Sequence, residues 1–379
     1  MDASKTPKPR TGTVPHGPAV WPPTAGWPAA VHAGVAALKH LVARWGVSAG
    51  QKVPPVLVAV SGGADSLALA VLAAETQRTT GIRFGAIVLD HRLQDITAEV
   101  AQRTSQICTR LGLAPVLTQD LTVTETGDGI EAAARQARYE AFAQCASEVQ
   151  AAGVLTAHTA NDQAEQVLLG LARGSGLRSI AGIRKHRTHA IPGYAPLRLG
   201  RPLLDLTRQE TESICAWAGL EYFDDPMNDD ESVARIRVRK NLLPALTDPV
   251  TGLGSGVFSG LVNTAALASD DAAVLDDLAA ETFRALAVET PDQLSFPLAD
   301  LQQLQPAILR RVLALAVQYF GAPQPTFERL RAIQELIFPP VGRASSAGPI
   351  QLEGHVSLYR KKAGQEYAKL LVIPSALGE

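Results

Sequence analysis

The sequence predicts an α/β fold in which a doubly wound, mostly parallel sheet is followed by a smaller, mainly helical domain. Short runs that are apolar on both faces alternate with longer helical segments through the first two thirds of the chain. This alternation is typical of a parallel sheet covered by helices on both sides. A glycine- and serine-rich turn joins the first apolar run to the first helical segment. With 379 residues the chain is longer than one core usually holds, so two domains are expected.

The same pattern divides the chain into four segments. Residues 1–28 contain seven prolines and are predicted to be a flexible, proline-rich tail. Residues 29–246 carry the alternating strands and helices, and residues 247–260, rich in Gly, Pro and Ser, are predicted to be a linker. Residues 261–379 form the second domain, with helical periodicity first and short strands near its end.

The predicted elements follow in chain order. The strands of the first domain are expected at Val56–Val60, Phe84–Leu89, Val116–Leu121 and Val154–Ala157. The helical segments around them are 64–74, Ile96–Leu111, Ile130–Val149 and Ala164–Ala172. In the second domain, helical periodicity covers Leu261–Leu286, Ala307–Phe320 and Phe327–Ile337, and residues 350–373 resemble short strands. In a fold of this class, ligands bind beyond the carboxyl ends of the strands.

Composition excludes several classes of protein. With 46% hydrophobic and 19% charged residues, the chain can bury sizeable cores, which excludes a wholly disordered protein. Cys108, Cys145 and Cys215 lie far apart and form no C-x-x-C pair, so neither a disulfide framework nor a cysteine-only metal site is expected. No apolar stretch reaches the roughly 18 to 20 residues of a membrane span, and no signal core follows the basic N-terminus. We therefore expect a cytoplasmic protein without membrane contact.

Basic residues are segregated along the chain although the formal net charge is only −2. Residues 166–204 and residues 232–247 contain no acidic residue. Their basic residues include Arg173, Arg178, Arg235, Arg237 and Arg239. Such one-signed stretches suit a polyanion partner, and two in succession leave nucleic acid and a solvated basic face as equal alternatives.

The stretch Ser61-Gly62-Gly63-Ala64-Asp65-Ser66 predicts a phosphate-binding loop between the first strand and its helix. Glycines let main-chain N–H groups converge on an anion, and the helix N-terminus adds partial positive charge. Two serine hydroxyls can donate hydrogen bonds, and Asp65 can orient a metal-bound phosphate. The spacing is not G-x-x-x-x-G-K-S/T, which argues against an NTPase that transfers the γ-phosphate. A purely structural turn is the alternative.

The string S-G-G-x-D-S after a buried strand resembles the PP-loop signature of the ATP pyrophosphatases. This resemblance implies a Rossmann-like domain, cleavage of ATP between its α and β phosphates, and adenylation of a substrate. It indicates the class of enzyme and leaves the substrate open.

Four further strings resemble those of the tRNA(Ile)-lysidine synthetase family and cover most of residues 55–246. The first, L-D-H-R-L at 89–93, ends the second strand, with Gln94 where the family usually has arginine. The second, residues 131–139, fits E-x-x-A-R-x-x-R-Y without departure. The third, residues 156–166, resembles A-H-H-x-D-D-Q-x-E-T, and R-G-S-G follows it. The fourth runs from D-P-M-N at 225–228 to L-L-P at 242–244. The departures in these last two strings are Thr159, Asn161, Gln166, Met227 and Ile236.

Local geometry groups the side chains that these strings supply. Arg135 and Arg138 are i, i+3 neighbours on a helix and suit a phosphate, with a surface ion pair as the alternative. His158 ends a strand, and Asp162 and Glu165 share one face of the following helix. Carboxylates that face a triphosphate usually act through Mg²⁺. Because Asn161 replaces one acidic group of the family pattern, a two-metal scheme is in doubt, and Asp162 is preferred as the ligand.

The resemblance implies that the enzyme adenylates the C2 oxygen of the wobble cytidine in a CAU-anticodon tRNA(Ile), after which the ε-amine of free L-lysine displaces AMP. ATP and Mg²⁺ are therefore expected, with this tRNA and lysine as partners, and a monomer or a homodimer is left open. Phosphate or nucleotide binding is implied for Ser61, Gly62, Gly63, Ala64, Asp65, Ser66, Asp90 and His158, and Mg²⁺ binding for Asp65 and Asp162. Catalysis is implied for Asp65, Arg135, Arg138, Asp162 and Glu165, and tRNA binding for Arg173, Arg178, Arg235, Arg237 and Arg239.

Rival functions differ in what they would require. A tRNA thiolase would need cysteines at the site strings, and a glutamine-dependent amidotransferase would need an ammonia-supplying domain. NAD synthetase-like chains share the phosphate loop but lack the fourth string. A nucleotide sensor or RNA-binding protein without catalysis would not need carboxylates around the loop.

Overall fold

The computed structural model describes residues 16–18, 20–50, 53–90, 95–121, 130–174, 176–225, 229–290, 293–338, 349–363 and 366–374. The chain divides into two compact units. The first comprises the residues up to Leu169 together with Gly182–Ala265, and the second comprises Gly170–Ala181 and the residues from Ala266 onward.

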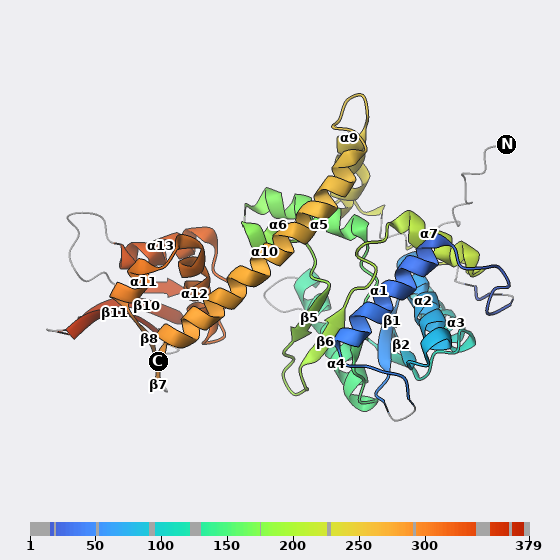
Figure 1. Cartoon of the computed structure of the whole chain (residues 1–379), viewed down its shortest axis with the longest axis horizontal. Coiled ribbons are helices and arrows are strands. Elements are labelled where there is room, and N and C mark those ends of the chain that lie inside the picture. The colour runs from blue at the N-terminus through green and yellow to red at the C-terminus, as the bar shows by residue number, and fades with distance from the viewer. Residues whose placement is uncertain are drawn as a thin grey trace. The chain divides into compact units, whose positions relative to one another are not determined.

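The first unit is built on a six-stranded sheet (Figure 1). Its strands are β1 (Val56–Val60), β2 (Phe84–Asp90), β3 (Val116–Asp120), β4 (Gly153–Leu155), β5 (His186–His189) and β6 (Leu197–Gly200). They lie in the order β3-β2-β1-β4-β6-β5, and every neighbouring pair is parallel except β5 and β6. From β1 the chain first proceeds to one side of the sheet and then returns to the other, which creates the switch point where such folds bind ligands. The predicted doubly wound α/β fold is confirmed.

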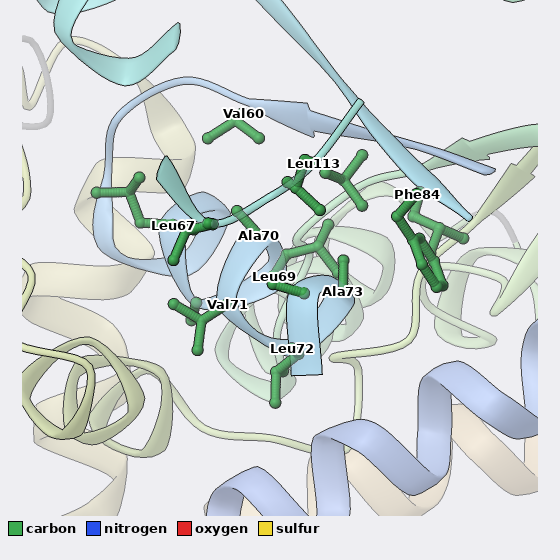
Figure 2. Close-up of a cluster of buried hydrophobic side chains, with 14 of the residues drawn as sticks. Val60, Leu67, Leu69, Ala70, Val71, Leu72, Ala73, Phe84 and Leu113 are labelled. Carbon is green, nitrogen blue, oxygen red and sulfur yellow. The ribbon is translucent and has the colours of Figure 1, made fainter. Parts of the chain in front are cut away.

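Helices cover both faces of this sheet because its central strands are apolar on both faces. The helices of the first unit include α1 (Ala29–Arg44), α2 (Ala64–Thr80), α3 (Asp95–Arg110), α4 (Ile130–Glu148) and α7 (Arg208–Trp217). Val56, Val58 and Val60 pack in one core with side chains of α1, α2, α3 and α7. Leu57 packs in the opposite core with side chains of α4. Figure 2 shows Leu67 and Ala70 of α2 within the first of these cores.

The antiparallel hairpin of β5 and β6 is absent from the predicted elements. Its outer strand reads His-Arg-Thr-His, and the first three of these residues are exposed. A strand without an apolar face gives no alternating hydrophobic signal, so the sequence pattern could not reveal it.

Residues 16–18 and 20–28, expected to belong to a flexible tail, are packed against the rest of the first unit. The indole N–H of Trp27 donates to the carboxylate of Glu75 at 2.6 Å, and that of Trp217 donates to the carbonyl oxygen of Gly26 at 3.1 Å. His16 forms an antiparallel bridge with Glu221. Tryptophan combines a large apolar area with one polar handle, so it can dock a proline-rich segment that forms no helix or strand. Residues 1–15 lie outside the described residues.

The chain is helical over part of the linker expected at 247–260. A π-helical turn (Val238–Leu242) and α9 (Leu243–Thr247) follow α8 (Ala234–Arg237), and α10 (Gly256–Leu286) begins after eight intervening residues. The carboxylate of Asp248 accepts from the backbone N–H groups of Val250 and Thr251 at 2.8 and 2.7 Å and so fixes the turn between them. The boundary between the two units falls inside α10, after Ala265.

The second unit combines helices with a five-stranded antiparallel sheet in the order β7-β8-β11-β10-β9. Its strands are β7 (Val288–Thr290), β8 (Gln293–Pro297), β9 (Ile350–Leu352), β10 (Val356–Ala363) and β11 (Glu366–Pro374). Its helices include α6 (Leu177–Ile180), α11 (Leu298–Gln303), α12 (Pro306–Gln318) and α13 (Phe327–Ile337). Phe296, Leu313 and Ile333 lie in its core. None of the described helices of the chain is long and apolar enough to cross a membrane.

Candidate active site

A cavity of about 500 Å³ lies in the first unit, where β1 and β4 end. Its wall includes apolar side chains of Ile87, Leu89 and Phe142. The polar residues that line it are Ser61, Asp65, Ser66, Arg135, Arg138, Tyr139, Thr156, His158, Asp162, Arg201, Arg208, Asp225 and Arg239. A cavity with an apolar wall and converging cations and carboxylates is typical of a binding site for a charged small molecule.

The loop after β1 holds its own shape. Gly62 has φ of 88°, a left-handed conformation that favours glycine. The hydroxyl of Ser66 donates to the carbonyl oxygen of Gly63 at 2.9 Å and accepts from the backbone N–H of Ser61 at 3.0 Å. The backbone N–H of Phe223 donates to the carbonyl oxygen of Gly62 at 2.9 Å and so ties the loop to the segment after α7. The loop therefore presents the free N–H groups of the first turn of α2 in a fixed position, which suits an anion.

Asp65 lies in the first turn of α2 and lines the cavity. Its Oδ1 accepts from the hydroxyl of Thr211 at 2.5 Å, and its Oδ2 lies 3.8 Å from a guanidinium nitrogen of Arg208. Burial raises the pKa of Asp65 above its ordinary value, although the hydrogen bond from Thr211 and the charge of Arg208 act in the opposite direction. A divalent cation at this carboxylate would favour its ionised form.

Asp162 lies in the first turn of α5 (Ala160–Arg173), and its carboxylate is shared between the backbone and a cation. Its Oδ2 accepts from the backbone N–H and hydroxyl of Thr159 at 2.8 and 3.1 Å, and Oδ1 accepts from Arg235 at 3.1 Å. Burial alone would raise the pKa of Asp162, but the charge of Arg235 and the N–H of Thr159 hold it below its ordinary value. His158, whose Nδ1 lies 3.0 Å from the hydroxyl of Thr156, is neutral at pH 7 because burial lowers its pKa to about 4.

Glu165, one turn further along α5, is completely buried. Its Oε2 accepts from Nε of Arg235 at 2.7 Å, and its Oε1 accepts from Nε of Arg239 at 2.6 Å. Both arginines come from the segment of α8 and the π-helical turn. Because both oxygens are already bonded, the carboxylate is placed to orient these arginines. Arg239 in turn lines the cavity.

Arg135 and Arg138 both line the cavity from α4, as their i, i+3 spacing predicted. The guanidinium of Arg135 lies over the ring of Tyr139, 5.0 Å from its centroid, and the imidazole of His189 lies 4.6 Å from the same ring. Burial lowers the pKa of Arg138 from its ordinary value. The side chain of Glu131, the first residue of the string at 131–139, lies outside the described residues.

Comparison of the chain with known proteins identifies its family. Residues 35–246 match the family model of a PP-loop domain, and residues 296–363 match that of a TilS substrate binding domain. The tRNA(Ile)-lysidine synthase of Leifsonia xyli subsp. xyli is 42% identical over 301 residues, which cover 79% of this chain and 85% of the relative. The chain belongs to the tRNA(Ile)-lysidine synthase family. The enzymes of that name from Salinispora arenicola and Streptomyces coelicolor are 42% and 43% identical, cover 71% of this chain, and are themselves covered to 77% and 73%.

In this member of the family, the residues predicted for the site are only partly gathered at the cavity. Asp90 lines a separate open hollow of about 650 Å³ between α3 and β3, together with Ser105 and Thr118. The neighbouring Leu89 faces the cavity instead. The structure thus does not bring Asp90 to the cavity lining.

The arginines predicted to bind tRNA are dispersed. Arg237 donates to the carbonyl oxygens of Glu231 and Ser232 at 2.7 and 2.6 Å. Arg173 and Arg178 belong to the second unit. There the guanidinium of Arg178 pairs with Asp276 at 2.6 Å. Their roles in tRNA binding stay predictions.

Sequence reasoning missed the contribution of α7. Arg208 lines the cavity, and Thr211 bonds Asp65 across 146 residues of sequence. The local signal was the capping box of Thr207 and Glu210, a Thr-x-x-Glu string that marks a helix start. This string predicts the start of a helix but does not predict which other elements that helix packs against. Arg201, which is 4% exposed and also lines the cavity, gave no local signal.

Proposed function

We propose that this enzyme ligates free L-lysine to C2 of the wobble cytidine in a CAU-anticodon tRNA(Ile), with conversion of ATP to AMP and pyrophosphate. One observation carries the proposal. The cavity is lined by the phosphate loop of residues 61–66, which includes the carboxylate of Asp65, by a second carboxylate, that of Asp162, and by several arginines. Binding of a nucleotide alone would not require carboxylates at the phosphates. Adenylation followed by attack of an amine uses positive groups to bind the phosphates and negative groups to bind Mg²⁺ and the amine. Membership of the tRNA(Ile)-lysidine synthase family supports the same substrates.

In the first step, the C2 oxygen of the cytidine attacks the α-phosphorus of ATP, and pyrophosphate leaves. The N–H groups at the start of α2 would bind the departing pyrophosphate with the positive end of the helix dipole. Arg135 and Arg138 would balance the negative charge that develops at the α-phosphate. These groups are in place before the reaction because the loop is fixed by its own hydrogen bonds.

In the second step, the ε-ammonium group of lysine loses one proton to water, and the resulting amine attacks C2. A second proton is lost to water as the C–N bond forms, and AMP leaves with the former C2 oxygen. Asp162 is held ionised by its surroundings and would bind the incoming ammonium group. His158 is neutral beside it, so it does not repel this cation. Glu165 would act on this chemistry through the two arginines that it holds.

Mg²⁺ fits the carboxylates of Asp65 and Asp162, which both line the cavity. Among the described residues, no group of three or more His, Cys, Asp or Glu side chains could hold a metal ion. A site with two protein carboxylates suits Mg²⁺, because this ion is usually shared with substrate phosphates and water. When bound, Mg²⁺ would neutralise phosphate charge.

A basic surface of the first unit would meet the tRNA backbone. The end of α1 and the β5–β6 hairpin come together there, and residues 29–50 and 166–204 contain no acidic residue. Arg44 lies 3.3 Å from the imidazole of His186, and Arg198 donates to the carbonyl oxygen of Trp45 at 3.2 Å. Two acid-free segments that are distant in sequence thus form one cationic surface, which suits RNA phosphates. A tRNA substrate also supports a location in the cytoplasm.

A tRNA thiolase is the rival that the cysteines exclude. No cysteine is among the residues that line the cavity. All three thiols are buried, and burial raises the pKa of Cys108 to about 12 and that of Cys145 to about 11. Thiols of this kind are protonated and inert, so they do not supply the nucleophile that thiolation requires.

The test is incorporation of labelled lysine into a CAU-anticodon tRNA(Ile) transcript with ATP and Mg²⁺, with methionine tRNA as the control RNA. We expect label in the isoleucine tRNA alone. Asp162→Asn should abolish incorporation, whereas the matched variant Asp205→Asn, at a carboxylate 64% exposed and paired with Lys185, should not. Pyrophosphate release without lysine incorporation would contradict the proposed nucleophile while retaining the class of enzyme.

A further inference from the structure

Helix α7 supplies a hydroxyl that the sequence motifs do not include. We propose that Thr211 is a positioning residue that holds the carboxylate of Asp65 at the phosphate loop in the orientation that ATP and Mg²⁺ require. This inference takes the identity of the reaction from the proposed function. The role of Thr211 is inferred from the geometry of α7.

The hydroxyl of Thr211 has no contact with solvent, since the residue is 0% exposed. Its oxygen lies 2.5 Å from Oδ1 of Asp65 and 2.8 Å from the carbonyl oxygen of Arg208. A hydroxyl has one proton to donate, and an ionised carboxylate is the stronger acceptor of the two. With Asp65 ionised, the hydroxyl therefore donates to Oδ1, the oxygen on the buried side.

The second carboxylate oxygen of Asp65, Oδ2, lies beside a cation instead of a hydroxyl. Oδ2 lies 3.8 Å from a guanidinium nitrogen of Arg208, and Arg208 itself lines the cavity. Nε of Arg208 is held by Glu212 at 3.3 Å, so this arginine has a defined place. One oxygen is thus anchored to the protein, and the other is left facing a cation at the cavity, where a metal ion or phosphate would bind.

The position of α7 is fixed from two sides. The amide oxygen of Asn161 accepts from the backbone N–H of Arg208 at 2.9 Å, which attaches α7 to the start of α5. The thiol of Cys215 donates to the carbonyl oxygen of Ala64 at 3.3 Å, which attaches α7 to the start of α2. Asn161 immediately precedes Asp162. Helix α7 therefore sets the position of Asp65 relative to Asp162, the two residues assigned to Mg²⁺.

Asn161 is also the departure from the family string that put the metal scheme in doubt. Its amide oxygen is directed to the N-terminus of α7, and Asn161 is not among the residues that line the cavity. An acceptor without charge is sufficient for that hydrogen bond.

Thr211→Val tests this role, because it replaces the hydroxyl with a methyl group of similar size. Thr211→Ser retains the hydroxyl and is the conservative rescue. The matched control is Thr76→Val, since Thr76 is also fully buried in a helix and its hydroxyl donates only to the carbonyl oxygen of Leu72 at 2.7 Å. The measurements are the Mg²⁺ dependence of pyrophosphate release, kcat and KM for ATP and lysine, and the melting temperature.

We expect Thr211→Val to lower kcat/KM for ATP about 10- to 100-fold, the loss of a hydrogen bond to a charged group. It should require more Mg²⁺ for half-maximal rate and leave KM for lysine unchanged. Thr211→Ser should stay within about 3-fold of the wild type, as should Thr76→Val. An unchanged Mg²⁺ dependence in Thr211→Val would overturn the inference, as would a serine variant as impaired as the valine variant.

Two further results separate this inference from the proposed function. If the wild type forms lysidine and Thr211→Val does so equally well, the inference alone fails. If the wild type forms no lysidine, calorimetric titration with ATP and Mg²⁺ still compares the variants, and equal affinities would overturn the inference. If Thr211→Val does not fold, Thr211→Ala takes its place in both experiments.

Discussion

Glu165→Gln should destabilise the first unit, because it removes the buried charge that joins two arginines. Glu165 is fully buried, and its two oxygens accept from Arg235 at 2.7 Å and from Arg239 at 2.6 Å. Removal of one partner from a fully buried ion pair costs about 3 to 5 kcal/mol. The arginine side chains are 36% and 33% exposed, so water compensates them in part. We therefore expect a loss of about 2 to 3 kcal/mol in the free energy of unfolding, or a fall of roughly 5 to 10 °C in melting temperature.

The assay is urea unfolding and thermal melting followed by circular dichroism, with Asp205→Asn as the matched control. Asp205 lies at the same 2.6 Å from its partner Lys185, but the two side chains are 64% and 58% exposed. An exposed pair contributes at most about 1 kcal/mol, so the control should change stability little. Equal losses in the two variants would refute the reasoning. Full stability without lysidine formation in Glu165→Gln would instead place Glu165 in contact with substrate.

Three further outcomes follow from the structure. Asn161→Asp should retain at least a third of wild-type turnover with an unchanged Mg²⁺ requirement. Either side chain can accept the hydrogen bond from the backbone N–H at the N-terminus of α7. A lowered Mg²⁺ requirement would instead show that the new carboxylate is a second metal ligand. His158 should lower the free energy of unfolding by up to about 2 kcal/mol from pH 7 to pH 5, since its pKa is 6.5 unfolded but about 4 folded and the unfolded chain binds the extra proton. His189, whose pKa burial also lowers to about 4, contributes in the same direction, so His158→Gln should remove only the His158 part of the dependence in urea unfolding at the two pH values. The double variant Arg44→Glu, Arg198→Glu should raise KM for tRNA several-fold and make that KM less dependent on salt, with KM for ATP unchanged. The control Arg103→Glu, at an exposed residue of α3, should leave KM for tRNA and its salt dependence unchanged.

The parts of the site that lie within one strand–loop–helix unit were predictable from the sequence. The phosphate loop follows β1 and opens α2 as its glycines indicated. Arg135 and Arg138 share a helix face because their spacing alone determines it. The parallel sheet followed from apolar runs of strand length, since strands buried on both faces show no alternation.

The remaining parts depend on tertiary packing. Thr211 reaches Asp65 only because α7 packs on α2, and no local pattern encodes that contact. The helical spacing of Asp162 and Glu165 was predicted correctly, but it did not indicate that Glu165 is buried under two arginines. Asp90 lies at a strand end as expected, but its side chain lines the open hollow beside α3 and not the cavity. A one-residue step along a strand reverses the face, and the sequence does not show which face the cavity occupies.

The most direct test of the central claim is a two-stage reaction with ATP labelled at the α-phosphate and a CAU-anticodon tRNA(Ile). In the first stage lysine is omitted, and in the second an excess of lysine is added. We expect label on the tRNA in the first stage, accompanied by pyrophosphate, and release of that label as AMP when lysine is added. Label that never joins the tRNA, or labelled ADP as the product, would contradict cleavage of ATP between its α and β phosphates in this cavity.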